Sequence, residues 1–469
     1  MALDKITILK FVGLLVGLLA KFTTGSIFVF SAYQDAIKYN FNYTQTEVEL
    51  LSSMLNVGLG VGFIPGMFYD RFGPALTSGV GIVLSVPIYL LIWSTVKFTE
   101  FYSSRAWLMS LYFLMAGFGS VFTYMVALNT NVINFSDRHT GKIIGLLNAF
   151  FAGSPSVFAT VFYRFFTSGV STDPANQDFA GFMLFFAVMF GVVNLLCVFL
   201  LRIYVIKDVT GDIQITYMKD SNGVVIDEIT LAVNGRNEIN KNSNGDISNQ
   251  TENDSTPKTI RETLCNLDYH IFSWVFALAS SVGLVYGNNI TVTSKAVGFD
   301  YYNDKLLIII PITNAIVSAS IGVISDKIQK KIPRPTIVVI ACISYVIAQA
   351  LAVALADKLT VLVIATAFVG FSTGIMWSIC PTIMKERFSV EHLGRNWGIA
   401  IMLAAVAAFV SQLVFGALYD ARVTDANNCY GITCVQSGYG VSLSMAVLSL
   451  VLGILLITRR RCCHANRIS

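Results

Sequence analysis

The sequence predicts an all-α membrane protein with twelve transmembrane helices in two pseudo-symmetric six-helix bundles. Composition is the first observation: 55% of the 469 residues are hydrophobic, only 13% are charged, and the mean hydropathy is +0.66, whereas soluble domains carry about 25% charged residues. The second observation is that long apolar runs recur along the chain, since roughly 20 apolar residues are needed to span a bilayer. The third is a short polar motif that occurs once in each half of the chain.

Six spans are expected on each side of a polar middle segment. Those of the first half are 9–33, 47–69, 75–96, 106–131, 142–166 and 179–203, and those of the second are 269–291, 304–325, 335–356, 360–384, 396–419 and 438–458. The segment between them is rich in Asn, Asp, Ser and Lys and has too few apolar residues to fold alone. The predicted parts are a six-helix bundle (1–203), a flexible cytoplasmic linker (204–268), a second bundle (269–458) and a basic cytoplasmic tail (459–469).

Basic residues indicate the orientation. Lys and Arg concentrate in the loops of one side and in the tail, so both termini are expected to be cytoplasmic. The net charge of +4 then reflects topology, and no nucleic-acid partner is expected. On the opposite side Asn42-Tyr43-Thr44 is a candidate glycosylation site. The protein is expected to be a monomer in the lipid bilayer, and the sequence does not distinguish the plasma membrane from an endomembrane.

Two of the eight cysteines, Cys429 and Cys434, fall in the last external loop. Because the outer face is oxidising, a disulfide between them is the favoured interpretation. A zinc site would need two further ligands nearby, and none is visible. No metal or cofactor is therefore expected.

The polar motif has the form Gly-x-x-x-Asp-(Arg/Lys), and both copies follow an apolar stretch. Residues 66–73 read GMFYDRFG and residues 322–327 read GVISDK. Glycine lets membrane helices approach closely, and a carboxylate can meet the positive N-terminus of a neighbouring helix. We therefore expect a latch that holds the two halves together in one state, formed by Gly66, Asp70, Arg71, Gly322, Asp326 and Lys327. Simple polar loop caps are the alternative, which two matched copies disfavour.

The chain resembles the major facilitator superfamily over all twelve spans, and more narrowly its nodulin-like branch, near the monocarboxylate and oxalate–formate porters. The likeness lies in residues 25–33 (GSIFVFSAY), 66–74 (GMFYDRFGP), 386–394 (ERFSVEHLG), 416–420 (GALYD) and the loop CYGITC at 429–434. The resemblance implies alternating access, with a substrate site near the midplane between the halves. Monocarboxylate porters carry an acidic-Gly-aromatic signature in span one and an Asp–Arg pair in span eight. Both are absent here, so their mechanism is not carried over.

Lys21 is the unusual residue of the spans, because it lies about midway along the first one. A charge at the centre of a helix costs roughly 2.5–3.5 kcal/mol on insertion scales, so such a residue is a functional candidate by default. No acidic residue occupies another span core. We therefore expect Lys21 to contact an anionic substrate. A lysine that snorkels to an interface, or is neutral in a wet cavity, is the alternative.

Further candidates to bind a substrate are polar or amphipathic residues of the spans. Each is as well suited to hydrogen-bond a neighbouring helix, which contributes about 0.6 kcal/mol on average. They are Thr24, Asn56, Tyr124, Asn148, Tyr286, Asn288, Asn314, Trp377 and Gln412.

The class of function is indicated by the chemical groups that the predicted spans contain and by those that they lack. No convergent nucleophile, base or metal ligands occur at membrane depth, which argues against an enzyme, and no P-loop indicates ATP-driven transport. The expectation is a secondary transporter that moves a small, anionic organic solute by alternating access. A transporter-derived receptor or sensor without turnover, or a carrier of a neutral or cationic solute, stays open.

Overall fold

The computed structural model describes residues 5–135, 139–168, 174–204, 260–388, 390–422 and 429–465. The helices of the first half are α1 (Lys5–Gly25), η1 (Ser26–Val29), α2 (Phe30–Phe41), α3 (Gln45–Gly60), α4 (Phe63–Thr95), η2 (Val96–Phe98), α5 (Thr99–Ser103), α6 (Ala106–Asn134), α7 (Thr140–Phe165), η4 (Pro174–Asn176) and α8 (Phe179–Leu200). Those that follow are α10 (Ile260–Cys265), α11 (Leu267–Ala296), η5 (Asp300–Tyr302), α12 (Asn303–Ile328), α13 (Arg334–Leu355), α14 (Leu359–Arg387), α15 (Leu393–Asp420) and α16 (Thr433–Ala465).

Eleven stretches of these residues are long and apolar enough to cross a membrane. The longest, Leu50–Ser103, has 54 residues, and as one straight helix it would be about 80 Å long, against roughly 30 Å of hydrocarbon. Gly73 interrupts it with φ 73° and ψ −174°, a backbone conformation that favours glycine, and Pro74 follows. The chain turns there, so this stretch supplies two spans, and the prediction of a twelve-helix membrane protein is confirmed.

Several boundaries differ from the expected ones. The first span is longer than 9–33, because α1, η1 and α2 continue as helical turns from Lys5 to Phe41. Asn42 follows α2 in the left-handed conformation (φ 54°), and Thr44 caps the N-terminus of α3 through a capping box with Glu47. At the other end of the chain α16 continues through most of the predicted tail, 459–469. The predicted linker, 204–268, lies outside the described residues except for 204 and 260–268, where α10 and the start of α11 are helical.

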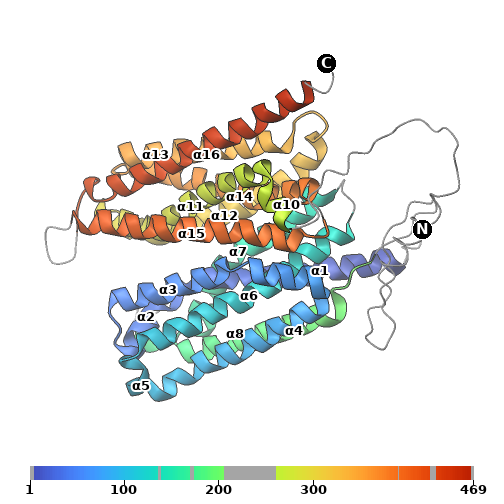
Figure 1. The fold of residues 1–469 in the computed structure, drawn as a ribbon. Helices are drawn as coiled ribbons and strands as arrows, with labels where there is room; N and C mark the ends of the chain where they lie inside the picture. Colours follow the sequence, from blue (N-terminus) through green and yellow to red (C-terminus); the bar gives the residue numbers. More distant parts are fainter. Residues whose placement is uncertain are drawn as a thin grey trace, which may run out of the picture.

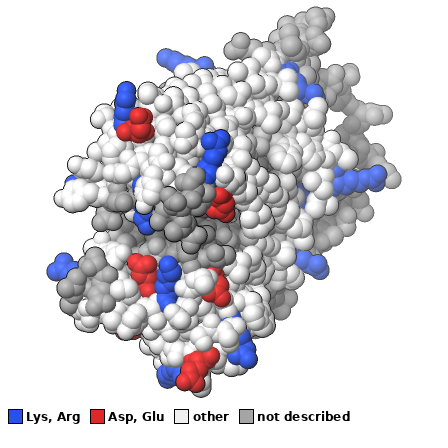
Figure 2. All heavy atoms as spheres, turned by 90° about the vertical axis from the view of Figure 1, so that its left-hand side faces the viewer, with Lys and Arg blue, Asp and Glu red and all other residues white. Residues whose placement is uncertain are grey.

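The two halves lie side by side (Figure 1). Helix α12 of the second half packs along α7 of the first, and α15 packs against α4 and α3. We call the end of the molecule that contains Leu201 and Ile260 the linker end, and the opposite end, which contains Asn42 and Arg105, the far end. Figure 2 looks onto the far end, where basic and acidic side chains are interspersed among uncharged ones.

An aromatic core fixes the helices of the first half near the far end. Tyr33 of α2 contacts the ring of Phe182 of α8 with centroids 5.8 Å apart, and Phe162 of α7 contacts the same ring at 4.9 Å. All three side chains are buried. Aromatic pairs at such distances add to the packing of their area, so these contacts hold α2, α7 and α8 as one unit.

Candidate functional site

Asp70 lies in α4 just before the break at Gly73 and against the start of α15. Its Oδ1 accepts the backbone N–H of Gly394 at 3.0 Å, and its Oδ2 accepts that of Arg395 at 2.7 Å. Because α15 begins at Leu393, these N–H groups belong to the first turn and have no partner within the helix. The carboxylate thus joins the halves and meets the positive end of a helix dipole.

Asp326, near the end of α12, repeats this arrangement with the halves exchanged. Its two carboxylate oxygens accept the backbone N–H groups of Gly141 at 3.0 Å and Lys142 at 2.9 Å. Both donors lie in the first turn of α7, which begins at Thr140. Each half therefore contributes one aspartate and one helix N-terminus to the contact at the linker end.

The motif glycines are located where the paired helices approach closely. A Cβ added to Gly66 would lie 2.0 Å from the carbonyl oxygen of Gly394, and one added to Gly322 would lie 2.2 Å from that of Gly141. Real Cβ atoms do not approach backbone that closely. Any larger residue at either position must push the two halves apart at the linker end.

The two aspartates differ in their charged neighbours. Arg334 of α13 donates from Nη2 to Oδ1 of Asp326 at 3.0 Å, and its Nε lies 3.0 Å from Oε1 of Glu386 of α14. Asp326 follows Asp70 by 256 positions in the sequence. The residues of the first half that precede Arg334 and Glu386 by the same 256 positions are Ser78 and Thr130, and neither is charged. Asp326 is therefore held by a buried ion pair within its own half. Asp70 makes no ion pair with any described residue.

The basic residues of the predicted latch lie outside this contact. Arg71 and Lys327 are exposed, and neither makes a hydrogen bond or an ion pair to another described residue. A cation that does join the halves is Lys385, which was not among the predicted residues. Its Nζ donates to the carbonyl oxygen of Val132 at 3.1 Å and to the hydroxyl of Thr140 at 2.9 Å.

Lys21 is buried in α1, with 1% of its surface exposed. Its Nζ lies 3.0 Å from the centroid of the Tyr124 ring of α6 and 5.5 Å from that of the Phe151 ring of α7. The ammonium makes no ion pair and no hydrogen bond with any described residue. Thr24, one turn further on, donates its hydroxyl proton to the carbonyl oxygen of Lys21 at 2.9 Å. The amine nitrogen of Lys21 thus contacts two rings and makes no polar contact with a described residue.

Aromatic side chains of the second half pack against the two rings that contact Lys21. Phe151 lies 6.5 Å, between ring centroids, from Trp377 of α14. Trp377 in turn lies 5.3 Å from Phe276 of α11 and 6.1 Å from Trp397 of α15. Trp397 donates its Nε1–H to the hydroxyl of Tyr124 at 3.3 Å. These five rings form a cluster, here called the aromatic cluster, that closes the interface between the halves next to Lys21.

Another polar contact between the halves lies on α7, one turn before Phe151. Asn148 donates from Nδ2 to the hydroxyl of Ser318 of α12 at 2.6 Å, and Ser318 donates to Oδ1 of Asn314 at 3.0 Å. Two of the predicted candidates, Asn148 and Asn314, thus belong to one network. Ser318 connects them and was not predicted.

The remaining candidates lie apart from Lys21. Tyr286 is buried within the second half and shares a hydrogen bond with the hydroxyl of Thr366 at 3.0 Å. Gln412 accepts from Asn289 at 3.0 Å, also within the second half. Neighbouring Asn288 is exposed and Asn56 is partly buried, and neither makes a hydrogen bond to another described residue.

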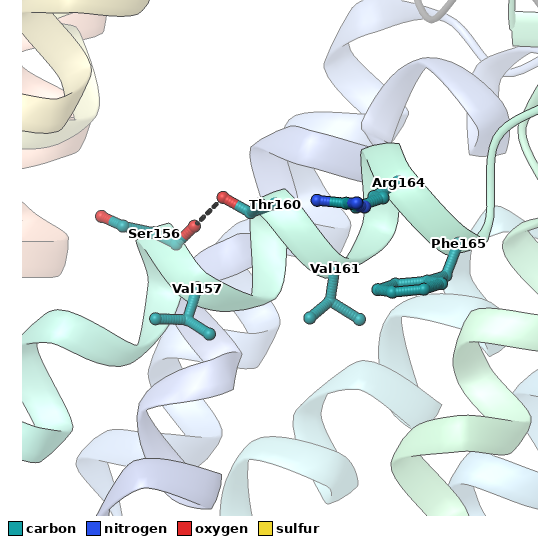
Figure 3. A pocket seen from close by; sticks show the side chains of 6 residues that line it. All are labelled: Ser156, Val157, Thr160, Val161, Arg164 and Phe165. Carbon is teal, nitrogen blue, oxygen red and sulfur yellow. Dashed lines mark hydrogen bonds between the residues drawn. The ribbon is translucent and has the colours of Figure 1, made fainter.

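At the far end no hydrogen bond between described residues joins the halves. The hydrogen bonds between the halves described above all lie at the linker end or beside the aromatic cluster. Towards the far end, the last turns of α7 carry a groove of about 430 Å³ lined by α7 alone (Figure 3). Its lining residues are Ser156, Val157, Thr160, Val161, Arg164 and Phe165.

Two further sequence predictions concern the loops of the far end. Cys429 and Cys434 are joined by a disulfide, and the N–H of Gly431 between them donates to the carbonyl oxygen of Ala296 at 2.7 Å. Asn42 is exposed. Beside it, burial raises the pKa of Tyr43 above its usual value, so its phenol stays protonated and donates to the carbonyl oxygen of Tyr102 at 2.8 Å.

Among the described residues, no group of three or more His, Cys, Asp or Glu side chains could hold a metal ion. The residues that sequence reasoning missed are mostly large apolar or neutral side chains: Phe151, Phe276, Trp397 and Ser318. Nothing in a single sequence separates such residues from ordinary core. Trp397 had the strongest signal, because it follows by three positions the stretch 386–394 that carries the family resemblance.

Two family models match the chain. The one described as Nodulin-like matches residues 10–222, and the one described as Major Facilitator Superfamily matches residues 263–463. Together they cover both six-helix halves.

Individual relatives are distant but span most of the chain. A protein of Neurospora crassa named probable transporter mch1 is 24% identical over 90% of this chain and 84% of its own length. A Saccharomyces cerevisiae protein named probable transporter MCH1 is 21% identical over 93% of this chain and 90% of its own length. An Escherichia coli protein named uncharacterized MFS-type transporter YhjX is 22% identical over 81% of each chain.

Proposed function

This chain belongs to the nodulin-like branch of the major facilitator superfamily and is a multi-pass membrane transporter, and we propose that it moves a small anionic organic solute by alternating access. One observation carries the anionic character of the solute: the amine of Lys21 is buried in the first half, against two rings that themselves contact the second half, and has no carboxylate partner among the described residues. A membrane-embedded charge without a partner is costly. A bound anion would supply the missing charge.

The aromatic cluster supports this position as the substrate site. Lys21, Tyr124 and Phe151 come from the first half, and Trp377 and Trp397 come from the second. A solute bound there would contact both halves at once. In a carrier built from two rocking bundles, such a site is exposed to opposite sides in turn.

The motif aspartates are the residues that would control opening and closing of the linker end. Asp70 and Asp326 hold the linker end closed by binding the N-termini of α15 and α7. Release of these contacts would open the linker end while the far end closes. With both termini in the cytoplasm, as the basic loops predict, the present state would face outward.

Uptake into liposomes tests the proposal directly. Purified protein is reconstituted and offered labelled acetate, oxalate, succinate and benzoate, with glucose and choline as neutral and cationic comparisons. The proposal expects accumulation of at least one anion above protein-free liposomes and none of glucose or choline. Accumulation of glucose or choline alone would overturn the anionic assignment, and binding of an anion without accumulation would favour a sensor.

A further inference from the structure

We propose that Tyr124 is a positioning residue that transmits the state of Lys21 to the start of α15, so that an anion bound at Lys21 loosens the linker-end contact. The inference rests on the proposed anion site. It adds to that site a route by which occupancy reaches the contact between the halves. The route consists of two side chains, Tyr124 and Trp397, and each of its contacts is present in the structure.

Tyr124 contacts both groups through different parts of its side chain. The face of its ring holds the ammonium of Lys21, with Nζ 3.0 Å from the centroid. Its hydroxyl accepts the indole N–H of Trp397 from the other half at 3.3 Å. All three side chains are buried, so no solvent separates these contacts. The position of one ring therefore depends on Lys21 and on Trp397 at the same time.

Trp397 connects this ring to the latch. It lies in the first turns of α15, three residues after Gly394 and two after Arg395, whose N–H groups bind Asp70. Its ring is fully buried and lies 4.7 Å, between centroids, from Phe276. Because Trp397 is rigidly packed on α15, a change in its hydrogen bond to Tyr124 acts on the same helix end that Asp70 holds.

An anion at Lys21 would compete with the ring for the ammonium. A cation over a ring is attracted by the ring's quadrupole, whereas a carboxylate offers a full opposite charge and charge-assisted hydrogen bonds. The ammonium would therefore leave the ring face when an anion binds. Tyr124 then loses the contact that holds its ring in place, and its bond to Trp397 weakens.

Hydrogen–deuterium exchange at the start of α15 measures the coupling between Lys21 and this helix end, and it needs no bound anion. Lys21→Gln removes the cation, and Tyr124→Phe keeps the ring but removes the bond to Trp397. Each change should make the peptide containing Gly394 and Arg395 exchange roughly five- to tenfold faster, the effect of losing about one net hydrogen bond. The double variant should be no faster than either single one, because both changes break the same route.

Tyr286→Phe is the matched control. Tyr286 is also a fully buried tyrosine, but its hydroxyl bonds Thr366 within the second half. This change should leave exchange at α15 as in the wild type. Trp397→Phe gives a second way to cut the same bond, should Tyr124→Phe fail to fold. It should reproduce the acceleration, and adding Lys21→Gln should increase it no further.

Wild-type exchange in Lys21→Gln, or additive acceleration in the double variant, would overturn the role of Tyr124. These outcomes are separable from failure of the anion site. If Lys21→Gln abolishes uptake but leaves exchange at the start of α15 unchanged, the proposed function stands and only the route through Tyr124 is excluded. If Lys21→Gln leaves uptake unchanged, Lys21 is not the anion site.

Discussion

The carboxylate of Asp70 accepts the backbone N–H of Arg395 at 2.7 Å, although the two residues are 325 positions apart and belong to different halves. Asp326 makes the equivalent contact with Lys142 at 2.9 Å. The chain thus uses one device twice: an aspartate at the end of a helix in one half binds the free N–H groups at the start of a helix in the other.

Asp70→Asn should weaken this contact. An amide keeps one acceptor oxygen but turns its NH2 group towards the second N–H donor, and it loses the charge. A hydrogen bond to a charged group contributes about 1.5–3 kcal/mol, so we expect a loss of that order in the free energy of unfolding, measured by denaturant titration in detergent. Asp357→Asn is the control, because Asp357 is exposed in the turn before α14. Equal stability of both variants would contradict the role of Asp70.

Asp326→Asn should destabilise the protein more than Asp70→Asn does. Arg334 is buried and would lose its buried carboxylate partner, and breaking a buried ion pair from one side typically costs about 3–5 kcal/mol. Replacing Arg334 by Met together with Asp326→Asn should cost less than either single change, since neither buried charge of the pair then remains, and Glu386, which also contacts Arg334, is partly exposed. The same unfolding titration gives all the values. A double variant as unstable as the sum of the two would show that the pair is not coupled.

Gly66→Ala and Gly322→Ala should each force the halves apart at the linker end, because the new methyl group would lie about 2 Å from a backbone carbonyl oxygen. Strain of this kind typically costs about 1–3 kcal/mol. Initial uptake into liposomes should fall in both variants. Gly416→Ala is the matched control, because no atom lies within 4 Å of its added Cβ. Normal uptake in the motif variants would mean that the close approach is unimportant for transport.

Replacing Cys429 and Cys434 together by Ser should lower stability without changing the latch. The disulfide closes a loop with a sequence separation of 5, for which chain entropy predicts about 2 kcal/mol. Thermal unfolding should shift downward, while hydrogen–deuterium exchange of the first turn of α15 stays as in the wild type. Faster exchange there would indicate that the far-end loop communicates with the linker end.

The sequence predicted the twelve helices well because apolar length and polar breaks are local properties. It also predicted that carboxylates at Asp70 and Asp326 meet the N-termini of neighbouring helices, and their hydrogen bonds do so. It did not predict which helix each one meets, because that depends on how the halves pack. Arg71 was placed in the latch by its position in the motif, yet its side chain is exposed.

The surroundings of Lys21 were predictable only in part. Lys21 and Tyr124 were singled out separately, as a charge and as an amphipathic side chain, but the sequence does not bring them together. Phe151 and Trp397 look like ordinary core residues in a chain with 12% aromatic residues. Only the packing of α1, α6, α7 and α15 places Phe151 beside Lys21 and the indole of Trp397 at the hydroxyl of Tyr124.

Uptake by Lys21→Gln is the measurement that decides whether Lys21 binds an anionic substrate. Glutamine is close to lysine in size and polar, so it removes the charge with little change in packing. The variant, reconstituted at the same density as the wild type, should lose nearly all uptake of whichever anion the wild type accumulates, while Lys21→Arg should retain part of it. Unchanged uptake in Lys21→Gln, at normal protein abundance, would mean that Lys21 does not bind the transported anion.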